Sequence, residues 1–299
     1  MREVCMSLFK GNGVAAVVAF NEDLSVNFDA YENFIKFLIK NEADAIIVNG
    51  TTGESATLSD EEQLQLIKCA VKAANGNVPI VAGAGSNNTN HALHLAKQAK
   101  EAGANGILAV TPYYNKPTQE GLVSHFELIA NACQLPTILY NVPGRTGCNN
   151  SPATCAKLSK NKYISGIKEA SGNITQIAEI SALTVNEDFS IYSGNDSEIV
   201  PTASVGGIGV ISVLGNIAPK QTHDMVLAFL SGDTKKATKM QLDCLPLVRA
   251  LFVESNPIPV KTTLNLMGLN MGGHRLPLTT PTKETITLLE KEMKAYGIL

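Results

Sequence analysis

The chain has 299 residues, 44% of them hydrophobic and 17% charged, a composition that excludes disorder as a description of the whole protein. With 24 Lys and Arg against 27 Asp and Glu, no tryptophan and 5% aromatic residues, it lacks the basic surface and stacking platforms of nucleic-acid-binding proteins. No secretion signal opens the sequence, and no stretch approaches the roughly 20 apolar residues of a membrane helix, so we expect a cytoplasmic protein.

Eight short apolar segments recur along the first three quarters of the chain, most of them roughly 30 residues apart. Each is rich in Ile, Val, Leu or Ala and carries little charge, which is typical of parallel strands covered on both faces. The predicted strands are residues 14–20, 45–49, 79–83, 106–110, 136–141, 164–169, 189–193 and 207–212.

The segments between these strands show helical spacing and helix-capping residues. Residues 28–41 place apolar side chains on one face, and Ser59 with Glu62 forms a capping box for a helix to about Ala74. Residues 88–103 are rich in alanine, and Pro152 is suited to the first turn of another helix.

This alternation predicts an α/β protein, a (β/α)8 TIM barrel over residues 1–231. An open doubly wound sheet is the alternative that strand counting leaves open. Beyond the predicted barrel, residues 232–299 show only helical patterns, at 235–254 and 282–296. We expect a C-terminal helical domain there.

Polar residues follow several of the predicted strands, where barrel enzymes carry their active sites. Lys168 interrupts an apolar strand, and alternation directs its side chain into the barrel interior. Desolvation there favours a neutral amine, which can attack a ketone and form a Schiff base. An ion pair with Glu169 or another acid is the structural alternative.

Each of the other polar residues at these strand ends has a functional and a structural interpretation. Thr51 and Thr52 lie in a glycine-flanked turn that either binds a carboxylate or only closes the chain. Arg145 is either a carboxylate clamp or a solvated loop residue, and Tyr113 with Tyr114 could pack in the core. Tyr140 needs a relay to move protons because a phenol is a weak base.

Dinucleotide-binding, P-loop and metal-site motifs are absent from the sequence. We therefore expect no metal and no cofactor. A buried lysine surrounded by hydroxyl groups and one arginine suits an imine reaction on an oxo-acid.

Four segments together carry a family resemblance: residues 50–55 (GTTGES), 111–115 (TPYYN), 140–147 (YNVPGRTG) and 166–170 (GIKEA). They closely resemble the dihydrodipicolinate synthase family, a group of pyruvate-dependent lyases, and the resemblance extends over essentially the whole chain. It implies condensation of pyruvate with L-aspartate 4-semialdehyde to 4-hydroxy-tetrahydrodipicolinate, the entry step of diaminopimelate and lysine biosynthesis. A sialic acid lyase, a sugar-acid aldolase or a non-catalytic metabolite-binding protein are the alternatives.

The resemblance also implies a role for each matching residue. Lys168 would form the Schiff base with pyruvate, and Tyr140 would relay protons through Thr51 to Tyr114. The tyrosine matching Tyr114 comes from a neighbouring subunit in this family, so a dimer would be required, and the common form is a homotetramer.

Four further residues would bind the substrates. Thr52 would bind the pyruvate carboxylate, and Arg145 the carboxylate of the semialdehyde. Ile211 would offer its backbone carbonyl to the site, and Gly194 would line it.

Family members that are inhibited by lysine bind it at the dimer interface. The positions that correspond to that regulatory site are Asp60, Gln63, Asn87, His91 and Tyr113. The glutamate that would pair with the ammonium group of the inhibitor is absent. We therefore predict weak or absent inhibition by lysine.

Overall fold

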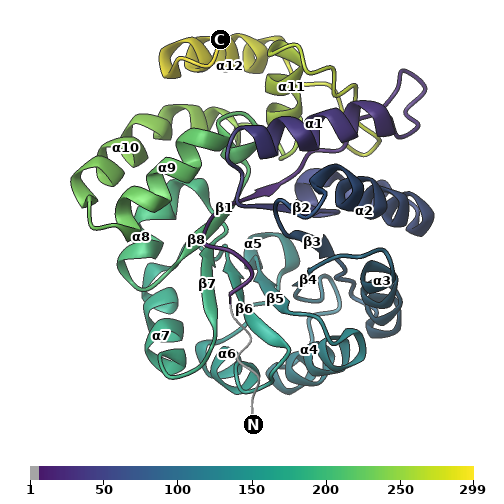
Figure 1. Ribbon diagram of the computed structural model, residues 1–299, viewed down its shortest axis with the longest axis vertical. Helices are drawn as coiled ribbons and strands as arrows, with labels where there is room; N and C mark the ends of the chain where they lie inside the picture. Colours follow the sequence, from purple (N-terminus) through teal and green to yellow (C-terminus); the bar gives the residue numbers. More distant parts are fainter. Residues whose placement is uncertain (1–6) are drawn as a thin grey trace.

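The computed structural model describes residues 7–299, so Cys5 lies outside the described part of the chain. Eight parallel strands close into one barrel, in which each strand pairs with the next and the last pairs with the first (Figure 1). The predicted barrel is therefore confirmed, and the open sheet is excluded. The strands are β1 Gly11–Ala15, β2 Ala45–Val48, β3 Ile80–Gly83, β4 Gly106–Val110, β5 Thr137–Asn141, β6 Ile164–Glu169, β7 Ser190–Ser193 and β8 Gly209–Ser212.

The prediction for the first strand was wrong, because residues 14–20 were expected and β1 is Gly11–Ala15. The apolar run continues beyond the strand because the loop that follows is itself buried. There the Val17 amide donates to Asn216 Oδ1 and the Phe20 amide to the Met271 carbonyl. Apolarity in this segment therefore reports burial against the turn after β8 and against the C-terminal part of the chain, and not only strand pairing.

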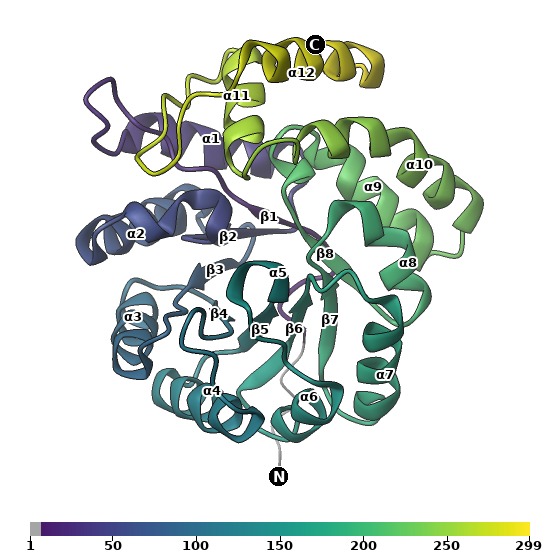
Figure 2. The ribbon, with the colours of Figure 1, turned by 180° about the vertical axis from the view of Figure 1, so that it is seen from behind.

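Helices surround the barrel, as Figures 1 and 2 show from opposite sides. The predicted capping box is confirmed, since Ser59 Oγ accepts from the Glu62 amide and the Ser59 amide donates to Glu62 Oε2. Pro152 begins a helix as predicted. The helices over the barrel are α1 Phe28–Lys40, α2 Asp60–Ala74, α3 Thr89–Glu101, α4 Gln119–Cys133, α5 Pro143–Thr146, α6 Pro152–Leu158, α7 Ile174–Thr184, α8 Ile199–Ser204 and α9 Pro219–Leu230, with short 3-10 turns η1 Thr51–Gly53, η2 Ser55–Thr57, η3 Asp196–Glu198 and η4 Leu214–Asn216.

The C-terminal part of the chain is helical, as expected. It forms α10 Thr234–Ala250, α11 Ile258–Leu266 and α12 Lys283–Tyr296. Helix α10 packs against α9 and α12, while α11 reaches η4 at the end of β8. In both views α11 and α12 lie at the same end of the molecule as α1 (Figures 1 and 2). The domain boundary at residue 231/232 stays a prediction. None of the helices within residues 7–299 combines the length and the apolarity that crossing a bilayer requires.

Two apolar cores flank the strands, one inside the barrel and one between the strands and the helices. Phe9 belongs to the inner core and precedes β1, where its ring stacks on Tyr192 with centroids 4.5 Å apart. The Tyr192 hydroxyl donates to the Phe9 carbonyl at 2.9 Å. These contacts fill the amino end of the barrel and leave the carboxyl end for a site.

His125 of α4 makes the stability of this fold sensitive to acid. Its side chain is buried beside Thr89 Oγ1, and burial lowers its pKa to about 4. The unfolded chain therefore binds the proton more tightly, and stability is lost as pH falls from about 6.5 towards about 4. We expect this residue to remove about 2 kcal/mol of unfolding free energy between neutral pH and about pH 5. Urea titrations at both pH values test this, and an unchanged pH dependence in His125→Gln would contradict it.

Candidate active site

A cavity of about 500 Å³ opens at the carboxyl end of the barrel. Its walls come from the turn after β2, the ends of β4 and β5, helix α5 and the segment that precedes α11. Thr51, Tyr140, Arg145, Asn256 and Tyr113 all line it. The structure thus brings together residues from the beginning, middle and end of the chain.

Lys168 lies next to this cavity, inside the barrel as predicted. It stands on β6 directly opposite Tyr140 of β5, and its Nζ lies 4.2 Å from the centre of the Tyr140 ring. Its residue is only 6% exposed, while the preceding Ile167 packs in the outer core. No ion pair found within residues 7–299 includes Lys168. The buried Asp196 is close enough to interact electrostatically with Lys168, but no acid of the described chain contacts the amine directly, which leaves it placed to react.

Glu169, the expected alternative partner of Lys168, is bound elsewhere. Its carboxylate accepts hydrogen bonds from the Asn141 and Gln176 side-chain amides and from the Ser171 backbone amide. Burial raises the pKa of Glu169, while these hydrogen bonds favour its charged form. Asn141 follows Tyr140 and Glu169 follows Lys168, so the network ties β5 to β6 beside the two candidate catalytic side chains.

Thr51 and Thr52 lie in the turn η1, immediately after β2. Thr51 lines the cavity, and Thr52 is buried with its Oγ1 accepting a hydrogen bond from Asn256 Nδ2 at 3.0 Å. Their backbone amides begin the turn, where a helix has no internal acceptors for its N–H groups. Hydroxyls and free amides facing a cavity can bind a carboxylate.

Tyr113 and Tyr114 are not core residues. Tyr113 is 41% exposed at the edge of the cavity, whereas Tyr114 is 88% exposed and does not line it. Tyr114 has a positive φ of 72°, and its amide donates to the Thr146 carbonyl. The described chain therefore does not by itself assemble the predicted relay from Tyr140 through Thr51 to Tyr114.

Arg145 is an exposed residue of α5 that lines the cavity. Its guanidinium donates to the Asn256 carbonyl at 3.4 Å, which leaves most of its donors for an anion.

Ile211 and Gly194 do not line this cavity. Ile211 is fully buried on β8 in the inner core, and Gly194 follows β7 with its amide donating to the Glu169 carbonyl at 2.7 Å. A Cβ on Gly194 would lie 2.6 Å from that of Ala170, so no larger residue fits there.

The residues of the predicted lysine site lie at one end of the same cavity. His91 Nε2 lies 3.0 Å from Asp60 Oδ1, and the Gln63 amide donates to the Ser55 and Leu58 carbonyls. These three side chains and Tyr113 line the cavity, but Asn87 does not, and its carbonyl accepts from Asn115.

One group of possible metal ligands occurs within residues 7–299, formed by Glu42, His223 and Asp224. Lys220 Nζ already contacts both carboxylates, at 2.8 Å and 3.3 Å. The group therefore resembles an ordinary surface ion-pair cluster.

Several residues of the C-terminal part contact the site although the sequence predicts no role for them. Asn256 contacts both Thr52 and Arg145, and Lys261 forms a buried ion pair with Glu54, next to η1. A lysine within an apolar helix and an Asn-Pro step before it were the only local signals for them.

The fold and the site define a (β/α)8 barrel protein with a buried lysine and a tyrosine beside a carboxyl-end cavity. The sequence matches the Dihydrodipicolinate synthetase family over residues 8–296. The chain therefore belongs to that family.

Individual relatives resemble it over nearly their whole length. A 4-hydroxy-tetrahydrodipicolinate synthase of Caldicellulosiruptor bescii is 53% identical over 293 residues, which cover 98% of this chain and 99% of the relative. The solved structure of a chloride-inhibited dihydrodipicolinate synthase from Acinetobacter baumannii, complexed with pyruvate, has a TM-score of 0.95 at 41% identity, covering 98% and 100% of the two chains. A solved dihydrodipicolinate synthase variant described as monomeric has a TM-score of 0.95 at 43% identity, covering 98% of each chain.

Proposed function

We propose that this protein is a lyase that condenses pyruvate with L-aspartate 4-semialdehyde through a Schiff base on Lys168, giving 4-hydroxy-tetrahydrodipicolinate. The observation that carries the proposal is the buried, unpaired Lys168 beside Tyr140 under a carboxyl-end cavity, in a chain of this family. The relatives' shared name and the pyruvate complex of one of them support the same reaction.

The chemistry starts at the Lys168 amine. Its nitrogen attacks the pyruvate carbonyl carbon, and loss of water leaves a protonated imine. The protonated imine is an electron sink, so a proton can leave the methyl carbon. Its loss converts the imine into an enamine. The enamine carbon then attacks the aldehyde, and the amine of the second substrate displaces Lys168 as the ring closes.

Each proton transfer in this sequence needs a positioned hydroxyl group. Tyr140 lies beside Lys168 and lines the cavity together with Thr51, so we assign its hydroxyl the exchange of protons with the bound intermediate. Thr52 and the amides of its turn bind the pyruvate carboxylate, and Arg145 binds that of the semialdehyde. Ile211 and Gly194 shape the site through their backbones.

The relay is completed in an oligomer. Tyr114 of one subunit enters the site of its partner, and the 88% exposure of its side chain supports this assignment. A dimer is the smallest active form, and a homotetramer and a cytoplasmic location stay predictions. Sedimentation of the active protein tests this, and a fully active monomer, the state described for one solved variant of the family, would contradict it.

The decisive experiment combines trapping with turnover. Borohydride reduction with pyruvate, followed by peptide mapping, is expected to label Lys168, and a label on another residue would overturn the mechanism. Product formation from pyruvate and L-aspartate 4-semialdehyde is then expected. If Lys168 is labelled with pyruvate but the protein turns over only sialic acid or a sugar acid, an aldolase would be favoured instead.

We expect weak or absent inhibition by L-lysine. His91 and Asp60 already bind one another at the predicted site, and none of the five residues of that site is a glutamate that could pair with an added ammonium group. Initial rates at increasing L-lysine test this, and a low-micromolar inhibition constant would contradict it.

A further inference from the structure

A fully buried ion pair joins the C-terminal part of the chain to the turn that follows β2. Lys261 Nζ of α11 lies 2.8 Å from Glu54 Oε1, and both side chains are 0% exposed. The two residues are 207 positions apart in the sequence. Lys261 Nζ also lies 4.0 Å from the centre of the Phe20 ring, in the buried loop after β1.

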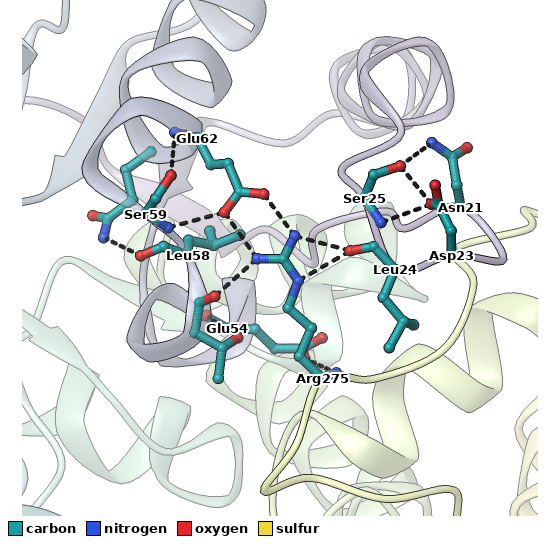
Figure 3. A network of polar contacts seen from close by, with 11 residues as sticks. Asn21, Asp23, Leu24, Ser25, Glu54, Leu58, Ser59, Glu62 and Arg275 are labelled. Carbon is teal, nitrogen blue, oxygen red and sulfur yellow. Dashed lines mark hydrogen bonds and ion pairs between the residues drawn. The ribbon is translucent and has the colours of Figure 1, made fainter.

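Arg275 extends this contact to the neighbouring elements (Figure 3). Its backbone amide donates to Glu54 Oε2, and its guanidinium forms two hydrogen bonds with Glu62 of α2, at 2.6 Å and 2.8 Å. The guanidinium also donates to the Leu24 and Thr57 carbonyls. The C-terminal chain is thereby tied to Glu54, to the end of η2, to helix α2 and to the loop after β1.

Glu54 is the residue that connects the two short 3-10 turns after β2. It lies between η1 and η2 in the left-handed conformation, with φ 52°, a conformation uncommon for a residue with a side chain. Thr51 and Thr52 precede it directly, and Asn256, just ahead of α11, holds the Thr52 hydroxyl. Two contacts from one short segment, Asn256 to Thr52 and Lys261 to Glu54, therefore set the position of the turn.

A buried ion pair of this kind is poorly explained by stability alone. Removing two charges from water costs several kcal/mol per ion, and apolar replacements of such pairs are often neutral or stabilising. Burial indeed lowers the pKa of Lys261, to about 8, which reports the cost of holding its charge there. The directional tie to a functional turn is the property that an apolar pair would not reproduce.

We propose, building on the function proposed above, that Lys261 and Glu54 are positioning residues that set the Thr51–Thr52 turn for pyruvate. Neither residue is assigned contact with the reacting atoms. Their loss misplaces the hydroxyl and amide groups that bind the pyruvate carboxylate, and a displacement of about 1 Å in such a site can cost about 100-fold in rate.

The test uses the full chain and only the first half of the reaction. The pyruvate concentration that gives half-maximal borohydride trapping at Lys168 is measured for wild type, Lys261→Met and the double variant Glu54→Gln/Lys261→Met. The double variant carries no unpaired buried charge, so it keeps the test decisive if Lys261→Met fails to fold. Lys220→Met is the matched control, since it breaks a pair of the same 2.8 Å length whose side chains are 52% and 47% exposed.

We expect this pyruvate concentration to rise about tenfold in both site variants and to stay within about twofold in Lys220→Met. A purely structural role would change at most the thermal midpoint of the double variant and leave this concentration at the wild-type value, which would overturn the inference. Wild-type protein that fails to react with pyruvate would instead refute the proposed function. Wild type that reacts with pyruvate without condensing it with the semialdehyde still permits the comparison.

Discussion

Lys168→Ala is expected to abolish trapping by pyruvate and to reduce turnover by at least about 10⁴-fold, the scale seen when an enzyme loses its nucleophile. Within residues 7–299 Lys261 is the only other buried lysine, and its amine is held by Glu54, so no substitute amine is available at that position. The substitution removes a side chain that lies against the Tyr140 ring without breaking an ion pair, so the fold is expected to survive.

The control for this variant is Lys162→Ala. Lys162 also lies over a tyrosine, with its Nζ 4.8 Å from the Tyr163 ring centre, but it is exposed and outside the barrel. Lys162→Ala is expected to keep wild-type trapping and turnover, measured beside Lys168→Ala by peptide mapping and initial rates. Substantial activity in folded Lys168→Ala would exclude the Schiff base from the mechanism.

The barrel could be predicted because its strands carry a local signal. A parallel strand covered on both faces must be apolar, so β4 and β6 have the bounds that were predicted. The same signal failed at β1, where Gly11–Ala15 begins with small residues and a buried loop continues the apolar run. No local sequence pattern predicts that a distant segment will bury an irregular stretch of backbone.

Some residues of the candidate site could likewise be predicted from the sequence, and others could not. Lys168 and Tyr140 were found because a polar residue at the end of an apolar strand is unusual, and alternation gives the direction of its side chain. Asn256, Lys261 and Arg275 reach the site from more than 200 residues beyond the turn they contact. Only the packing of α11 over the barrel brings them there. Their role could not be read from spacing in the sequence.

Arg145→Ala is expected to separate the two halves of the reaction. Trapping with pyruvate should stay within about twofold of wild type, because within residues 7–299 the Arg145 side chain does not bond to Lys168, Tyr140 or Thr52 and donates only to the Asn256 carbonyl. The kcat/KM for the semialdehyde should fall about 100-fold, which corresponds to about 2.7 kcal/mol. Loss of a charge-assisted contact to a carboxylate is sufficient for that effect.

Arg249→Ala, at an exposed position on α10 far along the chain, is the matched control and should leave both measurements unchanged. Trapping rates and semialdehyde saturation curves for the two variants test whether Arg145 acts only on the second substrate. A similar loss in both half-reactions would place Arg145 with the supports of the Thr51–Thr52 turn, through Asn256, rather than with the second substrate. An unchanged semialdehyde saturation curve would refute its role as the carboxylate clamp, and with it the feature that separates a synthase from a sugar-acid aldolase.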